Sequence, residues 1–174
     1  MSSGISRGSP TIASEKSAYN ITMDKTTFLV IRHGQTKWNK ESLMMGISDI
    51  PLTTEGMKQA QAVAKYLKAY PIDRIVTSPL IRAIQTAEAI HIYHPNIPLE
   101  RVQGLHERSF GVLEGLTYDE ANAFAPQMVM GSMWQYPNFR PPQGESLSDV
   151  AKRAQTVLKY LIRHYSGQTI AINK

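Results

Sequence analysis

The chain has 174 residues, close to the roughly 150 residues of one globular domain. We therefore expect one domain, residues 26–174, behind a disordered leader, residues 1–25. The longest apolar run, Phe28–Ile31, is far shorter than the ~20 residues that span a bilayer, and the polar leader does not resemble a signal peptide. No membrane partner is expected. The sequence contains no cysteine, which excludes disulfides and thiolate catalysis and makes the cytoplasm the expected compartment.

The net charge of +5 arises from 19 lysine and arginine residues that are spread along the chain. Such scattered charge argues against a nucleic-acid-binding stripe. It suits a small anionic substrate better, so nucleic acid is not expected as a partner.

From Thr26 onward, short β-like runs alternate with segments of helical periodicity, which is the pattern of βαβ units. This pattern predicts an α/β fold, a three-layer sandwich with a mostly parallel central sheet. The strands are expected at residues 27–31, 72–77, 97–102 and 169–172, with a polar loop over residues 32–52. Because the first strand is continuously apolar after Thr27, we expect it to be central and covered on both faces.

Helices are expected between the strands, and capping residues indicate where they begin. The starts are Thr53 or Thr54, a first turn containing Pro79, a capping box of Thr117 with Glu120, and Ser146. The last helix, residues 146–164, is expected to bury Leu147, Val150, Ala151, Ala154, Val157, Leu158, Leu161 and Ile162. Residues 117–142 are expected to form a cap segment, in which residues 121–142 carry substrate specificity.

Candidate chemistry lies where strands end. Arg32, His33 and Gly34 directly follow the first strand, at the carboxyl edge where open α/β sheets bind ligands. A lone histidine there would more often be structural, but a second strand-to-helix junction supplies Arg82. Two guanidiniums beside one imidazole predict a pocket for a phosphoryl group, because the planar fork of arginine matches phosphate oxygens.

Four ordered motifs extend this pattern over residues 27–172. They are Val30-Ile31-Arg32-His33-Gly34-Gln35-Thr36, Thr77-Ser78-Pro79-Leu80 with Arg82, Leu105-His106-Glu107 with Glu114-Gly115, and Gly144-Glu145-Ser146 with Arg153. With these motifs the sequence resembles the histidine phosphatase superfamily, in its phosphoglycerate-mutase-like branch. The resemblance implies a phosphoglycerate-mutase-like fold and a phosphomonoester hydrolase that works through phosphohistidine on a small phosphorylated substrate.

The resemblance also implies roles for individual residues. His33 would be the nucleophile, Arg32 and Arg82 would hold the phosphoryl oxygens, and Glu107 would be the general acid, a task that favours a raised pKa. The remaining substrate-binding candidates are Gln35, Asn39 and Gly46. No metal or cofactor is expected.

One departure from the family's pattern concerns a second catalytic histidine, which the resemblance implies just after residues 169–172. The sequence has none there, and the other histidines do not fit that role: His91, His94, His106 and His164. We therefore expect a domain truncated at its C-terminus and a 174-residue form that is weakly active or inactive. We also expect it to associate through an uncovered edge of the strand at 169–172, with the oligomeric state open. The alternatives are a phosphoglycerate mutase and a pseudophosphatase that binds phosphate esters without turnover.

Overall fold

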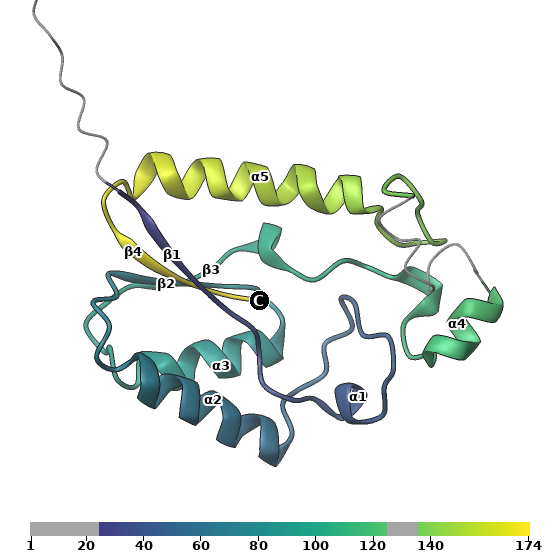
Figure 1. The fold of residues 1–174 in the computed structure, drawn as a ribbon, viewed down its shortest axis with the longest axis horizontal. Helices are drawn as coiled ribbons and strands as arrows, with labels where there is room; N and C mark the ends of the chain where they lie inside the picture. The colour runs from purple at the N-terminus through teal and green to yellow at the C-terminus, as the bar shows by residue number, and fades with distance from the viewer. Residues whose placement is uncertain (1–24, 125–135) are drawn as a thin grey trace, which may run out of the picture.

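The structure, a computed structural model, describes residues 25–124 and 136–174. Its sheet has four parallel strands in the order β1-β4-β2-β3 (Figure 1). The strands are β1 (Thr27–Ile31), β2 (Arg74–Thr77), β3 (Leu99–Arg101) and β4 (Thr169–Asn173). The predicted α/β class with a parallel sheet is confirmed.

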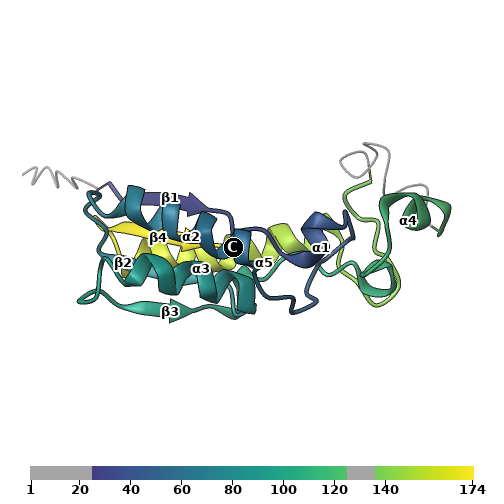
Figure 2. The ribbon, with the colours of Figure 1, turned by 90° about the horizontal axis from the view of Figure 1, so that it is seen from below.

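Helices cover both faces of this sheet, which gives the predicted three layers. Figure 2 shows α2 and α3 side by side, and Figure 1 shows them on one face of the sheet with α5 on the other. The helices are α1 (Lys37–Lys40), α2 (Thr54–Leu67), α3 (Ile81–His91), α4 (Tyr118–Phe124) and α5 (Leu147–His164), with short 3₁₀ turns η1 (Gln103–Leu105) and η2 (Gly111–Leu113). None of these helices, within the described ranges, is long and apolar enough to span a membrane.

Two apolar cores hold the layers together. Ile75 of β2 points into the core shared with α2 and α3, and the next residue, Val76, points into the core shared with α5. Successive side chains of a strand point to opposite faces, and here both faces are covered. This is why the two middle residues of β2, Ile75 and Val76, are both apolar although they point to opposite faces.

The helix starts follow the predicted caps with one exception. Thr53 caps α2 by accepting from the Gly56 amide, and Ser146 forms a reciprocal capping box with Asp149 at α5. Thr117 and Glu120 exchange the same pair of bonds before α4. Pro79, however, lies before α3 rather than in its first turn, because Leu80 is the N-cap.

The strand order corrects two expectations. β4 lies between β1 and β2, and both of its edges are paired. The expected association through a free edge of β4 is therefore wrong. β1, expected to be central, lies at the edge of the described sheet, and its Val30 is 77% exposed. An apolar run is compatible with either position, and only the long-range pairing decides between them.

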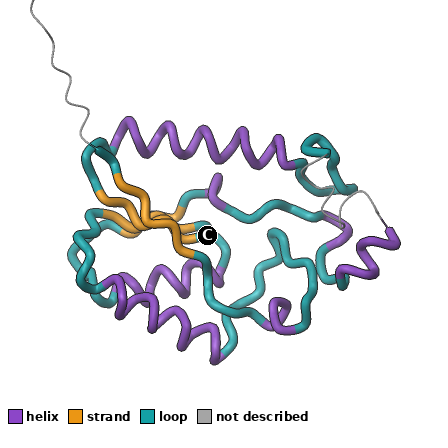
Figure 3. Tube along the Cα trace, viewed as in Figure 1, coloured by secondary structure: helices purple, strands orange, loops and turns teal. Residues whose placement is uncertain are grey.

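Two further expectations were too broad. Of the apolar face expected on α5, Val157 and Leu161 are buried, but Leu158 and Ile162 are 39% and 46% exposed. The loop expected at residues 32–52 is interrupted by α1, as Figure 3 shows. The leader, apart from residue 25, and residues 125–135 of the cap segment lie outside the described residues.

Candidate active site

A cavity of about 320 Å³ opens at the carboxyl ends of β1 and β4. The chain end that follows β4 is marked C in Figure 1. The walls of the cavity are Val30, Ile31, Arg32, His33, Glu107 and Lys174. Two further hollows, of about 370 and 260 Å³, share Arg32 and His33 with it. The structure therefore brings His33, Arg32 and Glu107 together at the edge where ligands bind in open α/β sheets.

His33 is held by backbone bonds that continue the parallel ladder beyond β1. Its amide donates to the Lys174 carbonyl at 3.0 Å, and the Lys174 amide donates to the Ile31 carbonyl at 3.1 Å. The ring nitrogen Nδ1 lies 2.7 Å from the Gly34 carbonyl. A carbonyl can only accept, so Nδ1 carries the proton and the neutral ring presents its lone pair at Nε2.

The charge of His33 is disfavoured where it lies. Burial lowers the pKa of the imidazole, the Gly34 hydrogen bond and Glu107 oppose that change, and the positive charges of Arg82 and Arg32 lower it further. The net direction is downward. Near neutral pH the ring is therefore the uncharged form, which is the form that can act as a nucleophile.

Gly34 allows the chain after β1 to pack directly on α2. A Cβ atom on Gly34 would lie 2.3 Å from the carbonyl oxygen of Gly56, in the first turn of α2. The Gly34 amide also lies 3.4 Å from Oγ1 of Thr86 on α3. Only glycine permits this backbone approach, which fixes the segment that follows His33.

The two predicted phosphate-binding arginines have different environments. Arg32 is exposed and lines all three hollows around His33. Arg82 is 1% exposed, and its guanidinium donates to the carbonyls of Gly46 and Ser48 at 2.7 and 2.8 Å. Arg82 thus anchors the loop before α2, while its charge still acts on His33.

That loop is fixed from its other side by Glu114. The carboxylate of Glu114 accepts from the amides of Ile47 and Ser48 at 3.1 and 2.8 Å, and from the amide of Phe110 at 2.9 Å. Gly46 has a positive φ of 53°, and a Cβ atom on it would lie 2.1 Å from Oε1 of Glu114. The carbonyls that hold Arg82 are therefore presented by a loop with little freedom to move.

The remaining substrate-binding candidates lie around His33 in different ways. Asn39 lines two of the hollows, but its Oδ1 accepts from the amide of Thr36 at 3.0 Å as part of the α1 capping box. Gln35 lines one hollow, and its Oε1 accepts from Thr53 at 3.1 Å. Gly46 lies in the wall of the hollow that also contains Glu107.

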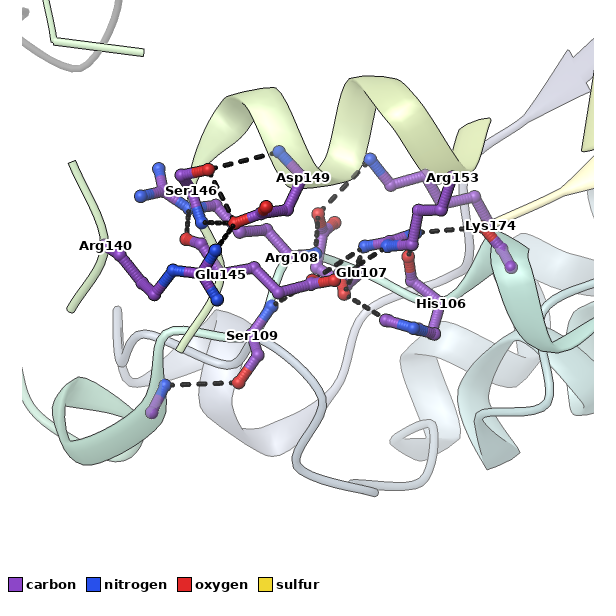
Figure 4. A network of polar contacts seen from close by, with 12 residues as sticks. His106, Glu107, Arg108, Ser109, Arg140, Glu145, Ser146, Asp149, Arg153 and Lys174 are labelled. Atoms are coloured by element: carbon purple, nitrogen blue, oxygen red, sulfur yellow. Dashed lines mark hydrogen bonds and ion pairs between the residues drawn. The ribbon is translucent and has the colours of Figure 1, made fainter. Parts of the chain in front are cut away.

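Glu107 is positioned through its backbone by Arg153 of α5 (Figure 4). The Arg153 guanidinium donates to the carbonyls of Gly104, His106 and Glu107 at 2.9, 2.7 and 3.1 Å. It also forms a two-pronged pair with Glu145, with both N···O distances 2.9 Å. This arrangement fixes the segment that carries Glu107 to the helix on the opposite side of the sheet from α2 and α3.

The electrostatic state of Glu107 differs from the expectation. Burial raises the pKa of the carboxyl, but the Arg108 amide, the Lys174 ammonium at 3.3 Å and the charge of Arg82 all lower it, and the net direction is downward. This direction is opposite to the raised pKa that favours a general acid. The lowering contributions are the hydrogen bond from the Arg108 amide and, after it, the charge of Lys174, a cation that the motifs did not include.

Sequence reasoning missed Lys174 as a site residue. The available signal was its place directly after the strand at 169–173, at the carboxyl edge of the sheet. Glu114, Glu145 and Arg153 belonged to the motifs, but the sequence does not reveal which groups they contact. In the part of the chain that the structure describes, no three His, Asp or Glu side chains gather to hold a metal ion.

Comparison with known proteins identifies the family of the chain. The sequence profile of the histidine phosphatase superfamily (branch 1) matches residues 28–173. An uncharacterized phosphatase, PhoE, of Bacillus subtilis is 33% identical over 147 residues, which cover 84% of this chain and 70% of that protein. A 2,3-bisphosphoglycerate-dependent phosphoglycerate mutase of Methylobacterium radiotolerans is 36% identical over 150 residues, which cover 83% of this chain and 71% of that protein.

Solved structures share the fold as well. YhfR of Bacillus stearothermophilus superposes with a TM-score of 0.78 and 33% identity, over 86% of this chain and 74% of that one. The similarity in sequence and in structure therefore spans the strands and loops that build the cavity around His33.

Proposed function

Because the chain belongs to the histidine phosphatase superfamily, branch 1, we propose that it hydrolyses a small phosphorylated metabolite through a phosphohistidine intermediate. The observation that carries this proposal is His33, a neutral imidazole with its Nε2 lone pair available, in a cavity with Arg32 and Glu107. The roles of these three residues and of Arg82 are part of the proposal.

In the first half-reaction, His33 Nε2 attacks phosphorus in line with the ester oxygen. The new N–P bond forms as the P–O bond breaks, and protonated Glu107 gives its proton to the departing alkoxide. Arg32, which lines the cavity, pairs through its guanidinium with the phosphoryl oxygens. Arg82 contributes positive charge near the phosphoryl group, and its guanidinium is already oriented by the carbonyls of Gly46 and Ser48.

In the second half-reaction, water attacks the phosphohistidine. The Glu107 carboxylate takes a proton from this water as the new P–O bond forms and the N–P bond breaks. His33 returns as a neutral imidazole, Glu107 is protonated again, and inorganic phosphate leaves.

A hydrolase is favoured over a mutase by the short sequence between Glu107 and Gly144. Cofactor-dependent mutases of this family typically carry a longer insertion after the catalytic glutamate, whereas here η2 follows within a few residues. The mutase remains the second candidate, because a relative of that name is 36% identical. Stimulation of turnover by a bisphosphoglycerate primer would favour the mutase.

The test is to trap the intermediate. We expect a labelled small phosphate ester, followed by an alkaline quench, to leave acid-labile label on His33. His33→Ala should lose the label, and His164→Ala, a change at the exposed end of α5, should keep it. Label that persists in His33→Ala, or is missing from a wild type that turns over, would refute the mechanism. Phosphate binding without turnover would instead indicate a pseudophosphatase.

A further inference from the structure

Lys174 enters the candidate site from the strand beside β1. Its amide donates to Ile31 and its carbonyl accepts from His33, so its backbone is held in the ladder next to the proposed nucleophile. Its side chain lines the same cavity, with Nζ 3.3 Å from Oε1 of Glu107. The side chain is 51% exposed, so it has room to move.

We propose that Lys174 is a phosphate-binding residue that alternates between two partners: Glu107 when no substrate is bound and the phosphoryl group when substrate is bound. This inference rests on the proposed function, in which the cavity beside His33 receives the phosphoryl group. It assigns Lys174 a direct contact with substrate and a second effect, exerted through Glu107.

The distribution of cations carries the first part. Among the six residues that line the cavity, Arg32 and Lys174 are the cations. Arg82 is buried, and its two terminal nitrogens already donate to the carbonyls of Gly46 and Ser48. A phosphoryl dianion that enters the cavity therefore meets the Arg32 fork and the Lys174 ammonium, whose flexible stem and three donors suit a mobile contact.

The choice of partner favours the phosphoryl group once it is present. A dianion attracts the ammonium more strongly than the single charge of Glu107 does at the same distance. Both ends of the Lys174–Glu107 pair are partly exposed, at 51% and 31%, and such pairs contribute little to stability. Breaking the pair therefore costs little, and the new contact replaces it.

The second part follows from what Glu107 loses. The charged and donor groups that face Glu107 are the amide and guanidinium of Arg108, Lys174 after β4, Arg82 from α3 and His33 after β1. When Lys174 turns to the phosphoryl group, one of the groups that lower the Glu107 pKa is withdrawn and a negative charge arrives nearby. Both changes favour the protonated carboxyl, the form that Glu107 needs as a general acid.

The binding test uses the 174-residue chain and inorganic phosphate as the probe. We expect Lys174→Met to weaken phosphate binding about tenfold in calorimetry, as for the loss of one charge-assisted contact, and Lys174→Arg to restore most of it. The control is Lys58→Met, which removes an exposed lysine paired with Glu55 at 3.9 Å on α2. It should bind phosphate as the wild type does, and equal binding by Lys174→Met would overturn the proposal.

A second measurement reads Glu107 without requiring turnover. Carbon-detected NMR of the carboxyl, assigned with Glu107→Gln, should show a higher Glu107 pKa in Lys174→Met than in the wild type without phosphate. An unchanged pKa would overturn the pairing. Melting temperatures of the variants confirm that each one is folded.

The outcomes separate this inference from the proposed function. His33-dependent hydrolysis together with Lys174-independent phosphate binding would refute the role of Lys174 and leave the hydrolase intact. Lys174-dependent binding without any phosphohistidine would support the role of Lys174 and refute the hydrolase.

Discussion

Replacing Arg82 by lysine tests whether one guanidinium both supports the loop before α2 and serves His33. Arg82 is 1% exposed and donates from two nitrogens, to Gly46 at 2.7 Å and to Ser48 at 2.8 Å. Lysine keeps the charge but has a single nitrogen on a flexible stem, so it does not reproduce the planar fork. We expect one of the two carbonyls to lose its donor.

The magnitude follows from that single lost bond. A hydrogen bond to a charged group contributes about 1.5–3 kcal/mol, so we expect the free energy of unfolding to fall by about 2 kcal/mol. For a domain of this size, that loss lowers the melting temperature by roughly 4–8 °C. Because Arg82 is also proposed to neutralise charge in the transition state, turnover should fall more than about tenfold, or ~1.5 kcal/mol.

The assay combines thermal unfolding with turnover of a phosphate ester. Arg101→Lys is a matched control, because the Arg101 side chain is 59% exposed and pairs with Glu88 at 3.7 Å. Arg101 belongs to β3, at the opposite edge of the sheet from β1. It should leave both quantities unchanged. An Arg82→Lys protein that melts and turns over like this control would show that the two carbonyl bonds carry no such energy, and the reasoning would fail.

Three further outcomes are expected. Gly34→Ala should lower the free energy of unfolding by about 1–3 kcal/mol in urea titrations, because its Cβ atom would lie 2.3 Å from the Gly56 carbonyl oxygen. An NMR titration of His33 should give a pKa below the ordinary ~6.5, because burial and the charges of Arg82 and Arg32 disfavour the imidazolium. The contribution of His33 to the free energy of unfolding is therefore full above pH ~6.5 and is lost as pH falls through the folded-state pKa. Glu107→Gln should impair esters with poor leaving groups far more than nitrophenyl phosphate, and equal losses would contradict a general-acid role.

The candidate site was predicted from sequence only as far as local signals reach. Arg32 and His33 directly follow a strand, and the rule that ligands bind at the carboxyl ends of parallel strands was enough to select them. Lys174 has the same relation to β4, but without the fold nothing indicated that β4 lies beside β1. The ion pair with Glu107, and the lowered pKa that it helps to cause, joins residues 67 positions apart.

Arg82 shows the same limit for a residue that was selected. Its place in the first turn of a helix after β2 indicated a cation near the phosphoryl pocket. That its terminal nitrogens are occupied by Gly46 and Ser48 depends on a loop that Glu114 holds from another part of the chain. A motif gives the identity of such residues but not the groups that they contact.

The sequence by itself determined the class of the fold, the caps of α2, α4 and α5, and the two residues that follow β1, because these depend on neighbours within a few positions. Only the tertiary structure decided the strand order, which moved β4 to the interior and β1 to the edge, and the burial of one narrow stripe of α5. The physical reason is that apolar periodicity indicates whether a segment forms a helix or a strand and which of its faces must be buried. Which other segment packs against that face is set by the packing energy summed over the whole chain.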